Sequence, residues 1–241
     1  MSDLAFSQLA LPTPLLECLT SLEYHQMTAV QAQSLPAILD GKDVIAQAKT
    51  GSGKTAAFAL GLLAKLDVKR YRIQTLVLCP TRELAEQVAA EIRKLARNIH
   101  NIKVLTLCGG VPSRSQIVSL EHGAHIIVGT PGRVLDHLQQ QRLDLTELTT
   151  LVLDEADRML EMGFADALNA ILANVPTERQ TLLFSATFDK AVRQIADSIM
   201  QNPVTVTVTS PHTQSSIEQQ FYQLDGTRRS DAVKLLLHRF Q

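Results

Sequence analysis

The sequence predicts an α/β fold with a mostly parallel sheet and helices on both faces. Short apolar runs of strand length alternate along the chain with longer runs of helical period, which is the pattern of strand–helix–strand units. The first junction is a loop of small residues between an apolar run at Val44–Ala46 and a helical run that begins at Lys54. Sheets of this kind bind ligands at the carboxyl ends of their strands.

Residues 1–40 are predicted to form a mostly helical lead-in. Pro14 lies at the start of a helix over Leu15–Leu22, and Gly41 follows a second helix that runs from Thr28 to Asp40. Proline near a helix start and glycine just past its end are the expected boundary residues.

Residues 41–209 are predicted to form the main domain, in which strands and helices alternate. The predicted strands are Val44–Ala46, Thr75–Cys79, Lys103–Cys108, His125–Thr130, Thr150–Leu153, Thr181–Ser185 and Val204–Val208. The predicted helices are Lys54–Leu66, Arg82–Arg97, Ser113–Glu121, Gly132–Gln140, Ala165–Asn174 and Lys190–Met200.

The last part of the chain, residues 210–241, has a different pattern. A polar stretch over residues 209–216 predicts a linker, Ile217–Leu224 alternates like a strand, and Arg229–Phe240 has the pattern of a helix. One strand and one helix cannot bury a core of their own. We therefore expect this part to be the truncated start of a second domain.

Composition and cysteine usage predict a cytoplasmic globular protein. The 241 residues are 45% hydrophobic and 20% charged, and no apolar run approaches the roughly 18 residues of a membrane span. The start at Met1–Asp3 lacks the basic and apolar pattern of a secretory signal. Cys18, Cys79 and Cys108 have no metal-binding spacing, so buried free thiols are expected. We expect no membrane partner and a monomer.

The loop before Lys54 predicts a site for a nucleoside triphosphate. Its residues are Ala48, Lys49, Thr50, Gly51, Ser52, Gly53, Lys54 and Thr55. Backbone N–H groups of such a loop and of the following helix point at phosphate oxygens, while Lys54 reaches the terminal phosphates and the Thr55 hydroxyl binds Mg²⁺. Ala48 stands where the usual pattern has glycine. The alternative interpretation is a Gly/Ser turn that simply precedes a helix.

Acidic residues follow the apolar strand at Thr150–Leu153. A carboxylate at the end of a buried strand is costly unless it is paired or binds a metal, so Asp154 is expected to share Mg²⁺ with Thr55. Glu155 is placed to orient or deprotonate the attacking water. The alternative is an acidic pair stabilised by a helix dipole.

The net charge of −1 argues against a generally basic nucleic-acid binder. Its distribution is uneven, because residues 65–103 are predominantly basic and residues 144–178 predominantly acidic. A basic edge attracts phosphates and an acidic edge suits a divalent cation, although both segments are equally compatible with solvated helix faces.

Six motifs in one order resemble the N-terminal RecA-like domain of DEAD-box RNA helicases. They are Ala48–Thr55, Pro80–Ala85, Gly109–Gly110, Thr130–Arg133, Asp154–Asp157 and Ser185–Thr187. The resemblance covers residues 6 to 209 and implies a RecA-like P-loop NTPase domain that binds ATP and Mg²⁺. Leu105–Gly110 and Ile217–Tyr222 look closest to the bacterial DbpA branch, which implies ribosomal RNA as the substrate.

The resemblance also implies how the adenine is bound. Gln31 matches the glutamine whose amide pairs with adenine N6 and N7, and Phe6 matches an upstream aromatic that stacks on the base. Tyr24 and Thr28 belong to the same recognition motif. Both prolines of the family's Pro-Thr-Pro pattern are missing around Thr28, which puts the rigidity of this loop in question.

Further roles follow from the resemblance. The segments expected to face RNA are Pro80, Thr81 and Arg82; Gly109 and Gly110; and Thr130, Pro131, Gly132 and Arg133. Helix starts and arginines there would bind phosphates, so little sequence preference is expected. Ser185 and Thr187 are expected to bond Asp157 and to couple hydrolysis to RNA binding. Taken alone, Thr130–Arg133 is also compatible with a turn before a helix, and the Ser185 and Thr187 hydroxyls with a strand-end cap.

The implied function is the core of an ATP-dependent RNA helicase that acts with a second RecA-like domain in cis, in ribosome assembly. Because the second-domain arginines are absent, the chain is expected to bind nucleotide with almost no turnover. Two alternatives stay open: a nucleotide-gated RNA-binding module without turnover, and an ATPase that translocates on DNA.

Overall fold

The computed structural model describes residues 4–208, 222–223 and 229–239. The chain divides into two compact units, residues 1–209 and 210–241. Helix α10 (Arg229–Arg239) is the described element of the second unit. The linker predicted at residues 209–216 and most of the strand predicted at Ile217–Leu224 lie outside the described residues.

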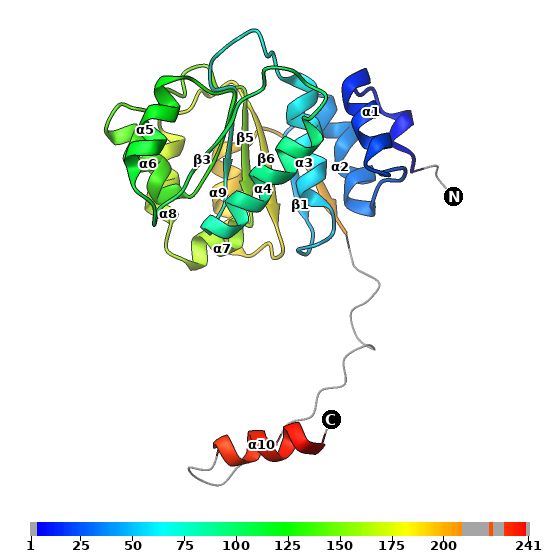
Figure 1. The fold of residues 1–241 in the computed structure, drawn as a ribbon, viewed down its shortest axis with the longest axis vertical. Helices are drawn as coiled ribbons and strands as arrows, with labels where there is room; N and C mark the ends of the chain where they lie inside the picture. Colours follow the sequence, from blue (N-terminus) through cyan, green and yellow to red (C-terminus); the bar gives the residue numbers. More distant parts are fainter. Residues whose placement is uncertain (1–3, 209–221, 224–228, 240–241) are drawn as a thin grey trace. The chain divides into compact units, whose positions relative to one another are not determined.

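The first unit is built on a seven-stranded sheet in which every pair of neighbouring strands is parallel (Figure 1). The strand order is β3-β4-β2-β5-β6-β1-β7. The strands are β1 (Val44–Gln47), β2 (Thr75–Leu78), β3 (Val104–Leu107), β4 (Ile126–Gly129), β5 (Thr150–Asp154), β6 (Gln180–Ser185) and β7 (Val204–Thr207). The predicted α/β fold with a parallel sheet is confirmed, and each strand lies within one or two residues of its predicted bounds.

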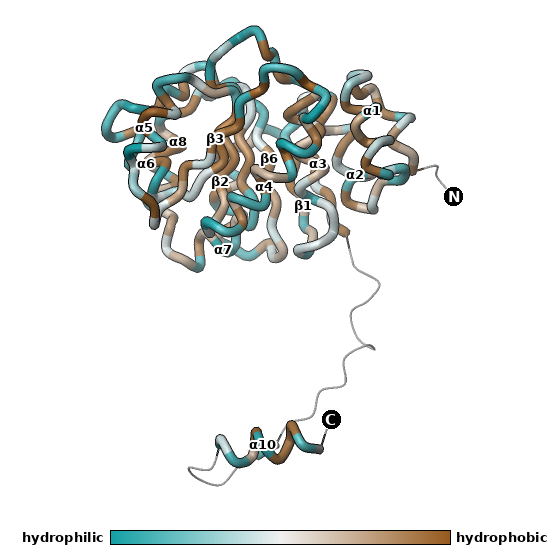
Figure 2. The backbone as a smooth tube through the Cα atoms, viewed as in Figure 1, coloured by the Kyte–Doolittle hydropathy of each residue, from teal (hydrophilic) through white to brown (hydrophobic). Residues whose placement is uncertain are grey.

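Helices cover both faces of the sheet because strand side chains alternate between two cores. Val77 and Cys79 pack into one core, whereas Leu76 and Leu78 pack into the other. The first core is closed by α1 (Thr13–Ser21), α2 (Ala29–Leu39), α3 (Lys54–Lys65) and α4 (Arg82–Leu95). The second core is closed by α6 (Pro131–Gln139), α7 (Ala156–Glu161), α8 (Ala165–Leu172) and α9 (Lys190–Ile199). Figure 2 shows apolar residues along β2, inside the sheet, and along β3 at its edge.

Local sequence signals fix several helix starts. The Thr81 hydroxyl accepts a bond from Leu84 N at the start of α4, and the Asp189 carboxylate accepts one from Val192 N at the start of α9. Helix α5 (Ser113–Glu121) has its predicted bounds. The structure adds α7 and a short 3₁₀ helix over Phe6–Gln8, neither of which was predicted. In the part of the chain that the structure describes, no helix has the length and apolar character needed to cross a bilayer.

Candidate nucleotide and nucleic-acid site

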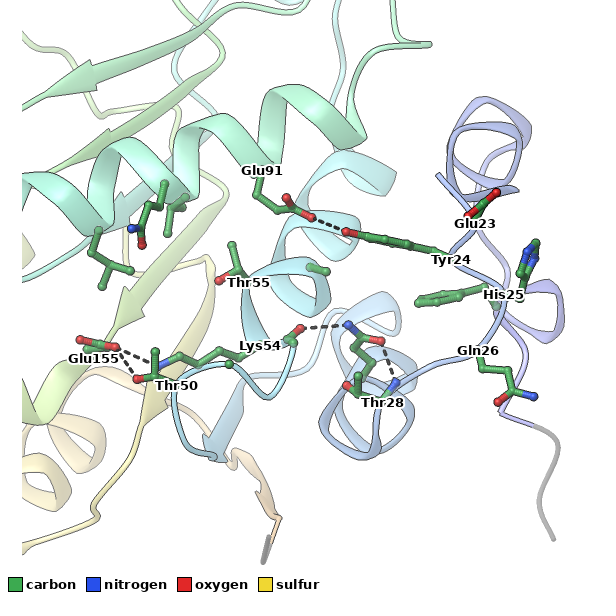
Figure 3. Close-up of a pocket in the computed structure, with 18 residues that line it drawn as sticks. Glu23, Tyr24, His25, Gln26, Thr28, Thr50, Lys54, Thr55, Glu91 and Glu155 are labelled. Carbon is green, nitrogen blue, oxygen red and sulfur yellow. Dashed lines mark hydrogen bonds and ion pairs between the residues drawn. The ribbon is translucent and has the colours of Figure 1, made fainter. Parts of the chain in front are cut away.

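An open pocket of about 1000 Å³ lies beside the loop between β1 and α3 (Figure 3). Its walls come from the lead-in, from the β1–α3 loop, from one face of α4 and from the end of β5. The lining residues from the lead-in include Phe6, Tyr24, Thr28 and Gln31. These four residues are the predicted adenine-side residues, and the structure brings them together with the predicted phosphate loop.

The β1–α3 loop requires glycine at two positions. Gly51 has a φ of 82° and Gly53 has a φ of 92°, a backbone region in which side chains are disfavoured. A Cβ on Gly53 would lie 2.7 Å from Gln31 Nε2 and 2.9 Å from Thr28 Oγ1. Ala48 replaces the usual first glycine without conflict, because its methyl group is buried in the core.

A buried cluster of charged side chains closes the pocket at the phosphate end. Lys54 Nζ lies 3.2 Å from Asp154 Oδ1 and 3.6 Å from Glu155 Oε1, and the Lys54 and Asp154 side chains are 3% and 0% exposed. The Thr50 hydroxyl donates a 2.9 Å bond to Glu155 Oε1. Lysine and carboxylates therefore pair with one another at the place where phosphate is expected.

Glu155 is held in a strained conformation that fixes the direction of its side chain. Its φ and ψ are both 53°, the left-handed region that non-glycine residues seldom adopt, and it caps the start of α7. Arg158 Nη1 lies 3.1 Å from Glu155 Oε2. Burial raises the pKa of the Glu155 carboxyl, but Thr50, Lys54 and Arg158 outweigh it, so the pKa lies below its ordinary value.

Asp154 fits the role of a Mg²⁺ ligand. Both of its carboxylate oxygens are buried and accept no hydrogen bond from any other described residue, although Lys54 supplies charge. Burial raises the pKa of the Asp154 carboxyl above its ordinary value, against the opposing effect of Lys54. Within the described ranges, no three His, Cys, Asp or Glu side chains gather to hold a metal alone. Mg²⁺ in nucleotide sites needs just one or two carboxylates in addition to phosphates and water.

Asp157 is bonded to the segment that follows β6. Thr187 N and Thr187 Oγ1 each donate a 2.9 Å bond to Asp157 Oδ2, and Ser185 Oγ accepts a 3.3 Å bond from Asp157 N. Burial raises the pKa of the Asp157 carboxyl, but the bonds from Thr187 outweigh it, so the pKa lies below its ordinary value. Thr187 thus bonds the Asp157 carboxylate as expected, whereas Ser185 bonds the backbone of this residue.

Gln31 connects the lead-in to the phosphate loop. Its Oε1 accepts a 2.8 Å bond from Thr28 N, and its Nε2 donates a 3.1 Å bond to the Gly53 carbonyl. Phe6 and Gln31 are both buried, at 4% and 5% exposed, although each lines the pocket. Tyr24 reaches across to α4, where its hydroxyl lies 3.4 Å from Glu91 Oε1 and accepts a 2.8 Å bond from Lys94.

The three predicted RNA-facing segments lie side by side at one edge of the sheet. They directly follow β2, β3 and β4, which are adjacent in the order β3-β4-β2. None of the segment residues lines the nucleotide pocket. Arg82 is paired with Glu86 at 2.7 Å, and the Arg133 side chain is 16% exposed.

Sequence reasoning missed the contribution of α4 to the pocket. Leu84, Gln87, Val88 and Glu91 line it from one face of this helix. Their spacing of three and four residues is the signal that could have placed them together. Arg158 was missed as a partner of Glu155, although opposite charges three residues apart are the pattern of an ion pair on a helix.

Comparison with known proteins decides the family. The sequence model of the DEAD/DEAH box helicase family matches residues 28–195, which is more than half of the chain. The chain belongs to the DEAD/DEAH box helicase family. The six motifs from which a DEAD-box resemblance was inferred all lie within this matched range, and the prediction is confirmed.

Three DEAD-box relatives and one solved structure define the likeness further. The ATP-dependent RNA helicase DbpA of Escherichia coli (strain K12) is 53% identical over 97% of this chain and 51% of its own length. DeaD of Escherichia coli (strain K12) is 44% identical, and CshA of Bacillus cereus is 42% identical, each over 96% of this chain. A DEAD box protein from Methanococcus jannaschii superposes with a TM-score of 0.81 and 37% identity, over 85% of this chain and 56% of that chain. The likeness to DbpA is confirmed.

The chain spans about half the length, or less, of the curated DEAD-box relatives that it matches. The matched share of the relative is 51% for DbpA, 37% for DeaD and 44% for CshA. What these relatives do as whole proteins therefore applies to this chain as a proposal.

Replacement of Lys54 tests the phosphate site of this DEAD-box chain. Lys54→Ala removes the ammonium group that is expected to reach the terminal phosphates of ATP. Because a buried charge-assisted contact to phosphate is then lost, we expect ATP·Mg²⁺ affinity to fall by at least about 100-fold. Titration of a fluorescent ATP analogue measures this change. Lys42→Ala is the control, because this side chain is 58% exposed and pairs with Asp40. Unchanged affinity of the Lys54→Ala chain would remove Lys54 from the site.

Replacement of Thr187 tests the bond to Asp157 through its pH dependence. Thr187→Val keeps the shape and removes a bond to an ionised carboxylate, so stability at pH 7 should fall by about 1–2 kcal/mol. Because the pKa of Asp157 is depressed in the folded state, this stabilisation is present above the unfolded pKa of about 3.9 and is lost as pH falls through the folded pKa. Urea unfolding at pH 7 and near pH 3 measures the difference.

The matched control for this test is Thr205→Val, on an exposed position of β7. Its effect should be small and the same at both pH values. A loss for Thr187→Val that stays constant from pH 7 to pH 3 would contradict the bond to the ionised carboxylate.

Proposed function

We propose that this chain is the ATP- and RNA-binding half of an ATP-dependent RNA helicase. The observation that carries the proposal is the buried Lys54–Asp154 pair beside the glycine loop. Three residues beyond Asp154, the Asp157 carboxylate accepts a bond from the Thr187 hydroxyl. A lysine and a carboxylate at this junction match the chemistry of a Mg²⁺–triphosphate site. Membership in the DEAD/DEAH box family and the names of the relatives, which are ATP-dependent RNA helicases, support RNA as the second ligand.

Each group of residues has a distinct task in the proposed site. The N–H groups of Lys49–Thr55 bind the phosphates, and Lys54 moves from Asp154 to the terminal phosphates. Asp154 and Thr55 would hold Mg²⁺, which neutralises charge on the phosphate oxygens when bound. Glu155 orients the attacking water and accepts its proton.

Turnover needs more positive charge at the γ-phosphate than this chain supplies. In phosphoryl transfer an arginine from a second element contributes on the order of 10³–10⁵ in rate. We propose that a second RecA-like domain in cis supplies it, and that residues 210–241 are the start of that domain. Closure of the two domains around ATP would then bend and separate a short RNA duplex.

The proposed RNA target is ribosomal RNA in ribosome assembly, on the strength of the likeness to DbpA. The contacts proposed for this half involve backbone and helix N-termini, so they do not read bases. We propose a monomer in the cytoplasm, where the three buried free thiols Cys18, Cys79 and Cys108 would stay reduced.

Phosphate release by the 241-residue chain tests the proposed division of labour. We expect negligible release from ATP alone, and the same with saturating duplex RNA, because the arginines of the second domain are needed. Strong RNA-stimulated phosphate release would show that the arginines of the second domain are not needed.

Competition between RNA and DNA of equal sequence, measured by anisotropy, separates the helicase from a DNA-translocating ATPase. A preference for DNA would contradict the RNA assignment.

The base preference tests the proposed role of Gln31. Gln31→Ala removes the amide that is proposed to read adenine, so the preference for ATP over GTP should fall by about tenfold, the worth of a good hydrogen-bonded pair. Competition of ATP and GTP against a fluorescent analogue measures the ratio. Gln87→Ala is the matched control, because Gln87 lines the same pocket from α4. An unaltered ratio in the Gln31→Ala chain would exclude Gln31 as the adenine reader.

A further inference from the structure

Gly109 and Gly110 lie between two backbone carbonyls that both accept side-chain hydrogen bonds. Gln116 Nε2 donates a 2.9 Å bond to the carbonyl of Cys108, directly before the glycines. Arg133 Nη2 donates a 3.2 Å bond to the carbonyl of Val111, directly after them. The two donors come from different helices, α5 and α6.

The two donors are also bonded to each other. Arg133 Nη1 donates a 3.3 Å bond to Gln116 Oε1, and His137 Nε2 lies 3.1 Å from the same oxygen. The Cys108 carbonyl can accept but not donate, so the Gln116 amide is oriented with its Nε2 toward Cys108. His137 must therefore carry its proton on Nε2, and Gln116 Oε1 accepts both bonds.

This network is built into the protein rather than lying on its surface. Gln116 is 8% exposed and His137 is fully buried. The Arg133 side chain is 16% exposed, and its Nε lies 3.9 Å from Asp136 Oδ2. Most of the Arg133 guanidinium is thus directed at the protein, which is not the arrangement of an arginine held free for a phosphate.

Glycine pairs need such support because they are the least restrained part of the backbone. Gly110 has a φ of 76°, and no Cβ limits either residue. Ordering one backbone residue on binding costs roughly 5- to 30-fold in affinity, and a conformation that is already ordered avoids this cost.

We propose that Gln116 and Arg133 form a latch that holds the Gly109–Gly110 backbone in the conformation that binds RNA phosphates. Both are then positioning residues, and Arg133 acts mainly through the loop. The proposal rests on the proposed RNA-binding function and adds to it which residues fix this surface.

Two substitutions remove the latch in different ways. Gln116→Leu is close in size and deletes all three of its bonds, whereas Arg133→Lys keeps the positive charge and loses the forked geometry. Both should lower RNA affinity roughly tenfold, leave ATP affinity unchanged and speed amide hydrogen exchange of residues 109–112. The double variant should be no weaker than the worse single variant, because both act on one loop.

The salt dependence of RNA binding separates the latch from a direct phosphate contact. Gln116→Leu removes no cation, so its slope of log affinity against log salt should equal that of the parent chain. If Arg133→Lys keeps the parental affinity while Arg133→Gln loses affinity and roughly 0.7 of the slope, Arg133 contacts phosphate directly and the latch is wrong. Gln139→Leu and Arg142→Lys are the matched controls, since both positions are exposed.

The outcomes also distinguish this proposal from the proposed function. If the parent chain binds no RNA, both fail. If the parent binds RNA and both Gln116→Leu and Arg133→Lys bind it equally well, the latch alone fails. Should Gln116→Leu lose cooperative unfolding, Arg133→Lys decides alone, through RNA affinity and exchange of residues 109–112.

Discussion

The buried pair of Lys54 and Asp154 is the constraint on which the nucleotide site depends. Both charges lie out of water, where such a pair is stable only with close partners. Two elements must supply those partners together: the first residue of α3 and the last residue of β5. The parallel sheet meets this need because it ends β5 and β1 at the same edge, with β6 between them. The strained backbone of Glu155 is a consequence, since the chain must turn directly after Asp154.

Contacts run outward from this pair in two directions. Toward the sheet, Asp157 lies in the first turn of α7 and is bonded to Thr187 after β6. Toward the lead-in, the loop carbonyl of Gly53 is bonded to Gln31, which also caps α2. The direct side-chain hydrogen bonds of the phosphate loop are therefore those of the Gly53 carbonyl to Gln31 and of Thr50 to Glu155.

The fold was largely predictable because its signals are local. Apolar strands and helical periods repeat along the chain, and the glycines at 51 and 53 stand where the backbone needs a positive φ. Helix α7 was missed because it is short and follows the strand without an intervening polar loop. The left-handed conformation of Glu155 has no sequence signal, since it is imposed by β5 and α7 together.

The site residues that directly follow a strand were predictable from the sequence. The contacts between residues that are far apart in the sequence were less predictable. Gln116 illustrates the limit of prediction from the sequence. Helix α5 has a weakly amphipathic sequence, in which a glutamine is expected to lie on the surface. Its burial follows from Cys108, just after β3, and from Arg133 and His137 on α6, which the tertiary fold brings near. The same holds for the face of α4 that lines the nucleotide pocket.

Helix α4 is the element that the two proposed ligand sites share. Its first turn carries Arg82, beside the glycine segment after β3, whereas Leu84, Val88 and Glu91 face the nucleotide pocket. A helix moves as one body when its core face is fully packed, and Ala85, Ala89 and Ile92 of α4 are buried. The proposed nucleotide site and the proposed RNA site therefore border the same packed helix.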